Sequence, residues 1–110
     1  PYVPNLTEAV GNSLREGGLE VLSISGMGIT DNLKIARQGA EEIADFVREN
    51  VSQEKLRDAD CLFLSCTNLP AVCALPELCA EFPDILIMTS NLSVINAVRR
   101  RLGKSTRPTA

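Results

Sequence analysis

The stretch Cys61-Leu62-Phe63-Leu64-Ser65, followed directly by Cys66-Thr67-Asn68, decides the fold of this chain. An uncharged apolar run of this length is typical of a β-strand that is covered on both faces, as in parallel sheets. The polar residues after it predict the end of the strand and a turn. Similar runs at residues 19–25 (LEVLSIS) and 85–88 (ILIM) predict two further strands.

Helical patterns separate these strands. Apolar residues at helical spacing predict helices over residues 39–51 and 91–102, and a first helix that ends before Gly17. Another regular helix is expected from about Leu75, after a separate turn, because Pro76 fits only the first turn of a helix. Strands that alternate with helices predict βαβ units. We therefore predict an α/β fold, a three-layer sandwich with a mainly parallel sheet over residues 1–102, followed by a polar tail at 103–110.

The composition limits the classes of function. The chain has 110 residues, a net charge of −3 and 45% apolar residues, which suit one domain and argue against nucleic-acid binding. No apolar stretch approaches the roughly 20 residues that span a bilayer, so no membrane partner is expected. Histidine is absent, which excludes a Cys–His dyad or a Ser–His–Asp triad within this chain. The gaps between the four cysteines do not suit zinc. A chain this apolar can fold without a disulfide framework, so we expect a reduced, cytoplasmic protein without metal.

The predicted strands place three polar segments at one edge of the sheet, because the carboxyl ends of parallel strands converge. These segments are residues 26–32, 66–69 and 89–91. They contain glycines, a thiol, hydroxyls and amides, and their free backbone N–H groups favour carboxylates and phosphates. Gly26-Met27-Gly28 lacks the third glycine of a dinucleotide fingerprint, so we interpret it as a tight turn.

Cys66 is the main candidate for chemistry. Backbone donors at the sheet edge would favour its thiolate, which is the nucleophilic form, although an inert, buried thiol fits the position equally well. Cys61, Cys73 and Cys79 fit structural roles better. Asn32, Ser90 and Asn91 either contact a ligand or cap helices, and Tyr2 either contacts a ligand or lies on the surface.

Taken together, these residues resemble a known family. The string Asp60 to Leu69 (DCLFLSCTNL), followed by Pro83, the run at 85–88 and Thr89-Ser90-Asn91, resembles the aspartate/glutamate racemase superfamily. It is most similar to the branch of maleate cis-trans isomerases and arylmalonate decarboxylases. Pro1-Tyr2 and residues 28–32 (GITDN), with residues 35–37, are similar to the same branch. The resemblance covers about residues 1–102, and the Ser-Cys-Thr-Asn turn is its most specific part.

The resemblance implies two similar α/β domains, with a cysteine from each facing a carboxylate substrate. This chain is similar to the second domain plus the last helix, which returns to the first domain. Neither the first domain nor its cysteine has a counterpart here. Cys66 then corresponds to the second cysteine, a proton donor or acceptor, and Thr67 and Asn68 hold a substrate carboxylate. Tyr2 and Asn32 stand where the isomerases place carboxylate-binding side chains, and Ser90 and Asn91 complete the expected substrate site.

These observations favour a cofactor-independent isomerase of a small dicarboxylate such as maleate, since the decarboxylases tend to carry glycines where Thr67-Asn68 stands. An aspartate or glutamate racemase and an arylmalonate decarboxylase-like lyase remain alternatives. So do a non-catalytic carboxylate-binding module, a thiol redox or phosphocysteine carrier, and a structural domain with unreactive thiols. We expect the 110-residue chain alone to be inactive, because half of the site is missing. An apolar face that the missing domain leaves open could form a homo-oligomer.

Overall fold

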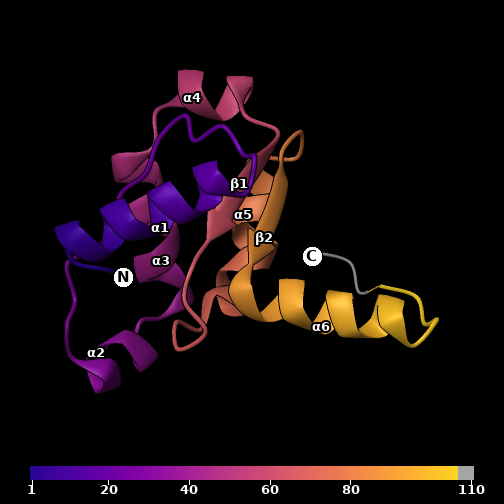
Figure 1. Ribbon diagram of the computed structural model, residues 1–110. Helices are drawn as coiled ribbons and strands as arrows, with labels where there is room; N and C mark the ends of the chain where they lie inside the picture. Colours follow the sequence, from indigo (N-terminus) through magenta and orange to yellow (C-terminus); the bar gives the residue numbers. More distant parts are fainter. Residues whose placement is uncertain (107–110) are drawn as a thin grey trace.

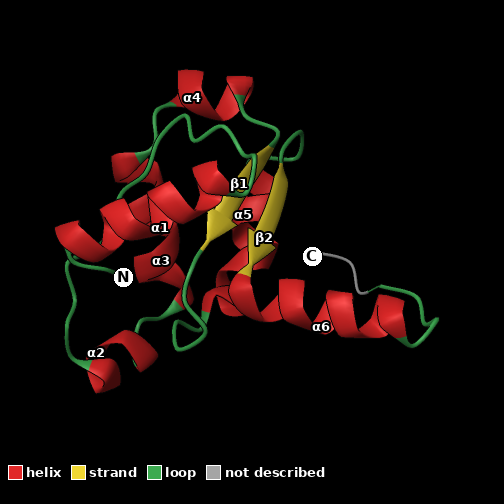
Figure 2. Ribbon diagram, viewed as in Figure 1, coloured by secondary structure: helices red, strands yellow, loops and turns green. Residues whose placement is uncertain are grey.

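Two parallel strands, β1 (Cys61–Leu64) and β2 (Leu86–Thr89), form the centre of the structure, a computed structural model that describes residues 1–106. Cys61 pairs with Leu86, and Leu64 pairs with Thr89. Figure 2 shows the two strands side by side with helices around them. The predicted α/β class and the parallel pairing of these two apolar runs are confirmed.

The connection between the strands is a short 3-10 helix, η1 (Ala71–Ala74), followed by α5 (Leu75–Glu81). Pro76 lies in the first turn of α5, where a helix needs no N–H donor. The expected separate turn before the regular helix is therefore confirmed. Leu75 and Leu78 are buried in the core, together with Ile87 of β2.

The remaining helices are α1 (Pro4–Glu16), α2 (Asn32–Ala36), α3 (Ala40–Asn50), α4 (Gln53–Asp58) and α6 (Ser90–Arg101). The predicted helices at residues 39–51 and 91–102 are confirmed to within two residues at each end. Helix α4 was not predicted, because its six residues give too short a pattern. Its start is fixed by Ser52, whose hydroxyl accepts a hydrogen bond from the backbone of Lys55 at 3.2 Å.

The two faces of the sheet differ in burial. Leu64, Ile87 and Thr89 are buried against the core, whereas Phe63 and Leu86 on the other face are 39% and 52% exposed. The expectation that both faces are covered is therefore wrong for these strands, and the three-layer sandwich is not confirmed. Helix α6 begins where β2 ends and extends away from the rest of the protein (Figure 1), so it leaves the outer face open.

Residues 19–25 were predicted to be a strand, and this prediction is wrong. They form an irregular segment. At its start the Leu19 N–H donates to the Leu14 carbonyl at 3.1 Å, and shortly after its end the Gly28 N–H donates to the Tyr2 carbonyl at 3.0 Å. The segment and β1 both line a cavity of about 240 Å³. Val21, Leu22 and Ile24 line this cavity, and the segment does not extend the sheet.

Beyond α6 and Leu102, which follows it, the chain turns at Gly103, whose φ of +67° is easily adopted by glycine. Residues 103–106 are exposed and polar, as expected of a tail, and the rest of the predicted tail, 107–110, lies outside the described residues. Within residues 1–106, no helix is both long and apolar enough to cross a membrane.

Candidate functional site

The candidate site is a turn that follows β1. Cys66 lies two residues beyond Leu64, the last residue of the strand, and its carbonyl accepts a hydrogen bond from the Leu69 N–H at 3.3 Å. The φ angle of Cys66 is +124°, a conformation that residues other than glycine rarely adopt. Such backbone strain is often found at functional sites, where surrounding contacts maintain it. The thiol is half-buried at the edge of the core.

The start of α6 holds this turn through two hydrogen bonds. The backbone N–H of Cys66 donates to the Oγ atom of Ser90 at 3.0 Å. The Nδ2 atom of Asn91 donates to the carbonyl of Thr67 at 3.0 Å. Neither residue caps the helix, because Thr89 does so: its hydroxyl accepts from the Leu92 N–H at 3.1 Å. The side chains of Ser90 and Asn91 therefore do not cap the helix, and they form hydrogen bonds with the Cys66 turn instead.

A third segment reaches the turn from α2. The Nδ2 atom of Asn68 donates to the carbonyl of Asn32 at 2.8 Å. Helix α2 itself is capped by Asp31, whose carboxylate accepts from the Leu33 N–H at 2.9 Å. Asn32 therefore belongs to the site through its backbone carbonyl, whereas the sequence pointed to its side chain.

Tyr2 approaches from the N-terminal segment. Its hydroxyl lies 3.1 Å from the hydroxyl oxygen of Ser65, the residue before Cys66. The position of Tyr2 is fixed by residues 26–29, which pass close beside it: a Cβ atom at Gly26 would overlap the Tyr2 carbonyl oxygen. The tight turn expected at Gly26-Met27-Gly28 thus has the specific role of holding Tyr2.

The structure brings together all seven residues that the sequence singled out. Cys66, Thr67 and Asn68 form the turn, and the other four surround it through the contacts described above, namely Tyr2, Asn32, Ser90 and Asn91. The difference from expectation lies in what they contact, since the side chains of Tyr2, Asn68, Ser90 and Asn91 form hydrogen bonds with other parts of the chain. Ser65 was missed, because nothing local distinguishes its hydroxyl from an ordinary strand-end residue.

Two backbone donors at the turn are open to a ligand. Thr67 and Asn68 are exposed, and within residues 1–106 neither backbone N–H has an acceptor at hydrogen-bond distance. Adjacent N–H groups of this kind favour anions such as carboxylates. The turn can therefore bind a carboxylate through its backbone, directly beside the Cys66 thiol.

The other cysteines lie apart from this turn, and all four are free. The pKa of Cys61 is raised, first because the surrounding protein displaces water from its sulfur and also because the Asp60 carboxylate is near. A backbone hydrogen bond from Met88 acts in the opposite direction. At neutral pH Cys61 is therefore held as a thiol, which fits a structural role. Cys61 also lines the 240 Å³ cavity, and so do Tyr2, Ser65 and Leu69, so the cavity adjoins the Cys66 turn although Cys66 itself does not line it.

No protein-family model matches the chain, and no curated protein matches it.

Proposed function

We propose that this chain is one of two cysteine-bearing halves of a cofactor-independent isomerase that acts on a small dicarboxylate such as maleate. The main support is the Cys66 turn, where a half-buried thiol lies beside two backbone N–H groups that no protein acceptor among residues 1–106 uses. The resemblance of the Ser-Cys-Thr-Asn sequence to the maleate isomerase branch of the aspartate/glutamate racemase superfamily suggests the reaction.

In the proposed reaction, a thiolate from the other half of the site adds to one olefinic carbon of maleate. The Cys66 thiol gives its proton to the neighbouring carbon, so the double bond becomes a single bond. Rotation about this bond follows. Cys66 thiolate then removes a proton from the carbon that was protonated, the first thiolate leaves, and fumarate forms. The N–H groups of Thr67 and Asn68 stabilise the negative charge that develops on the adjacent carboxylate.

The proposal requires a complement to this chain, either another domain or a second chain, which supplies the attacking cysteine. The same complement would cover the open face of the sheet, where Phe63 and Leu86 are partly exposed, and so complete a three-layer sandwich. Because the mechanism needs free thiols, a reducing, cytoplasmic location is part of the proposal.

The test is a proton NMR time course in D₂O on the full-length gene product, with maleate, an arylmalonate, L-aspartate and L-glutamate supplied separately. Conversion of maleate to fumarate supports the proposal. Loss of an amino-acid α-proton signal indicates a racemase instead, and decarboxylation of the malonate indicates a lyase. The variant Cys66→Ser should lose turnover and keep the fold, whereas Cys73→Ser, a change at an exposed cysteine in η1, should keep both. Normal activity of the Cys66→Ser variant would contradict the proposal.

A second candidate is a non-catalytic carboxylate-binding module. It is favoured by one observation: polar side-chain atoms of Asn68, Ser90 and Asn91 already bind the chain itself, which leaves the backbone N–H groups as the main ligand donors. This candidate predicts that maleate shifts the amide resonances of Thr67 and Asn68 in a saturable way without any chemical change.

A further inference from the structure

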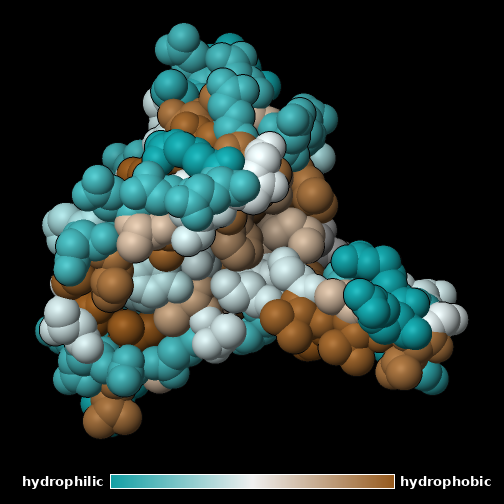
Figure 3. Space-filling view, in the orientation of Figure 1, coloured by the Kyte–Doolittle hydropathy of each residue, from teal (hydrophilic) through white to brown (hydrophobic). Residues whose placement is uncertain are grey.

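The cavity of about 240 Å³ beside the Cys66 turn is a site that the proposed reaction does not use. Its walls come from α1, α3, α4, β1 and the irregular segment at residues 21–25. Among residues 1–106, no residue of β2 or α6 lines it, so it is separate from the helix that the missing domain is expected to cover. Figure 3 shows hydrophobic residues at the surface between the hydrophilic residues of α4 and those of α1.

Most of the side chains that line this cavity are apolar. Ile43, Val47 and Leu56 form a buried part of the wall, whereas Val10 of α1 and Val21 of the irregular segment are only partly buried. Partly buried apolar side chains around an open cavity remain in contact with solvent. An apolar ligand that enters removes this surface from water, which favours binding.

The dimensions of the cavity limit the ligand. An apolar cavity of about 150 Å³ holds benzene, which has six heavy atoms, so a cavity of about 240 Å³ has room for about ten. All of residues 61–65 line the cavity, a stretch of roughly 13 Å at the usual rise of a strand. An unbranched chain therefore fits the cavity better than a compact ring does.

Lys55 is the charged residue of the cavity wall. It belongs to α4, which leads into the start of β1 (Figure 1), so it lies towards that end of the cavity. Within residues 1–106 its ammonium group forms no ion pair and no hydrogen bond, and no acidic side chain lines the cavity. Beyond the other end of the strand, the hydroxyls of Tyr2 and Ser65 already bond to each other at 3.1 Å. An anionic head group therefore has an unpaired cation to bind at the α4 end.

We propose that this cavity binds an unbranched monocarboxylate of about eight to ten carbons, with its chain along β1 and its carboxylate beside Lys55. The methyl end of the chain then lies near Tyr2, Ser65 and Leu69, which line the cavity and adjoin the Cys66 turn. This binding site goes beyond the proposed function and does not depend on it.

The length of the chain is tested by NMR titration of the full-length gene product, labelled at its valine methyl groups. Butanoate, hexanoate, octanoate, decanoate and dodecanoate are supplied separately, below the concentrations at which they form micelles. Octanoate should shift the methyl resonances of Val10, Val21 and Val47 in a saturable way. The dissociation constant should fall about three- to fourfold for each added methylene up to about ten carbons, and then stop falling. The methyl groups of Val72, which is exposed in η1 and outside the cavity, should not shift.

The place of the carboxylate is tested by removing the charge of Lys55. Lys55→Gln should raise the dissociation constant of octanoate about two- to fivefold, since an exposed ion pair contributes modestly, and should leave the binding of uncharged 1-octanol unchanged. The matched control is Arg57→Gln, which removes the same charge from α4 at a residue that does not line the cavity. It should change neither ligand's affinity.

The place of the chain is tested by filling part of the cavity. Val21→Phe should weaken octanoate more than butanoate, because the larger side chain takes up the space that the longer chain needs. Val72→Phe, the same substitution outside the cavity, should weaken neither. Circular dichroism shows that each variant remains folded, and the Lys55 and chain-length measurements test the site without Val21→Phe.

Four results would overturn the proposal. If no chain length shifts the Val10, Val21 and Val47 methyl groups, the cavity does not take an apolar chain. Equal shifts at Val72 indicate adsorption to exposed apolar surface instead of a site. If the affinity keeps rising through dodecanoate, the cavity does not enclose the chain. If Lys55→Gln and Arg57→Gln bind octanoate equally well, the carboxylate does not lie beside Lys55.

Discussion

The backbone N–H of Cys66 donates a hydrogen bond to the Oγ atom of Ser90 across 3.0 Å, and this bond joins the end of one strand to the start of the helix that follows the other. Cys66 has a φ angle of +124°, so a neighbouring contact must maintain its conformation. Ser90 is well placed to do so, because it is the first residue of α6 and Thr89 caps that helix. The geometry of the thiol therefore depends on a residue 24 positions away in the sequence.

Replacing Ser90 by alanine should lower the free energy of unfolding by about 1 kcal/mol, because the Cys66 N–H loses its acceptor. Urea denaturation measures the change. The control is Ser93→Ala, the same substitution one turn further along α6, where the hydroxyl has no hydrogen-bond partner among residues 1–106. If the two variants lose the same stability, the bond between Cys66 and Ser90 contributes nothing to the fold.

Gly26 should not tolerate a side chain. A Cβ atom there would overlap the carbonyl oxygen of Tyr2 and the hydroxyl of Thr7, so the backbone must shift. We expect Gly26→Ala to destabilise the protein by about 1–3 kcal/mol and to change the ring resonances of Tyr2. Gly17→Ala is the control, since a Cβ atom there meets nothing nearer than 3.4 Å. Wild-type stability of Gly26→Ala would contradict the close approach of the two segments.

The sequence predicted the parts of this structure that depend on local patterns. The uncharged run before Cys66 and the run at residues 85–88 predicted two parallel strands, and Pro76 predicted a separate turn before α5. The seven candidate residues were found because each follows a predicted strand or matches a family motif. The convergence of the residues that follow β1 and β2 comes from the parallel sheet, whereas Asn32 reaches the turn from α2 and Tyr2 from the N-terminal segment.

The parts that failed depend on contacts distant in the sequence. Residues 19–25 have a strand-like sequence but form no strand. The residues that follow them, Gly28 and Ile29, form backbone hydrogen bonds to Tyr2 and Pro1 instead. The exposure of Phe63 depends on the direction in which α6 leaves the sheet. No local pattern encodes either feature. The same limit explains why the partners of Asn32 and Tyr2 within the site could not be predicted.

The Asp60 carboxylate should slow the reaction of Cys61 with alkylating reagents. It contributes to the raised pKa of that thiol, so Asp60→Asn removes a negative charge that opposes thiolate formation. The pKa of Cys61 should fall, and a larger thiolate fraction at mildly alkaline pH should speed alkylation by iodoacetamide. Site-resolved mass spectrometry gives the rate at each cysteine. Asp58→Asn, at the end of α4, serves as the control, and an equal effect from it would show that only net charge matters.

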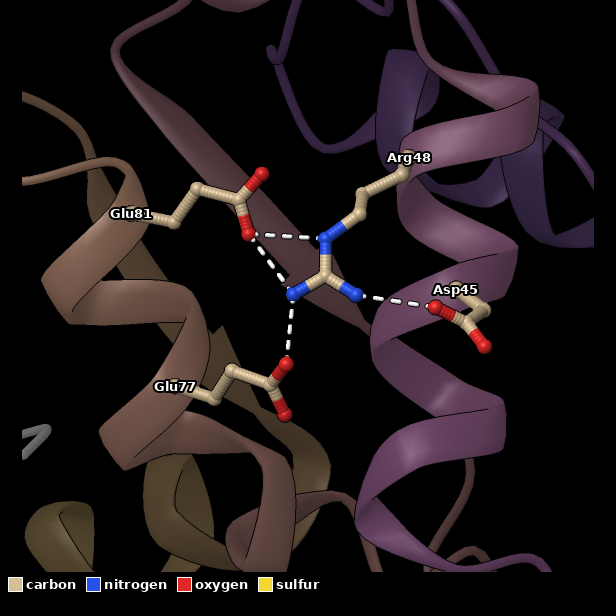
Figure 4. Close-up of polar contacts among 4 residues, drawn as sticks. All are labelled: Asp45, Arg48, Glu77 and Glu81. Carbon is tan, nitrogen blue, oxygen red and sulfur yellow. Dashed lines mark hydrogen bonds and ion pairs between the residues drawn. The ribbon is translucent and has the colours of Figure 1, made fainter.

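The last prediction concerns Arg48, which joins α3 to α5 on the surface (Figure 4). Its Nη2 atom lies 2.5 Å from Glu77 and its Nε atom 2.8 Å from Glu81, while Nη1 lies 2.9 Å from Asp45 on its own helix. The hydrogen bonds to Glu77 and Glu81 raise the pKa of Arg48 further above its ordinary value, so it remains charged at every working pH.

A single exposed ion pair contributes little to the stability of the fold. One guanidinium shared among three carboxylates also reduces the repulsion between those acidic groups. Arg48→Met should therefore lower Tm in low-salt buffer, and the loss should shrink as salt screens the remaining repulsion. Arg57→Met is the matched control, because within residues 1–106 Arg57 forms no ion pair and its one side-chain hydrogen bond is to the Gln53 carbonyl. A loss that is equal in both variants, or that salt does not change, would mean that packing of the arginine stem and not its charge links α3 to α5.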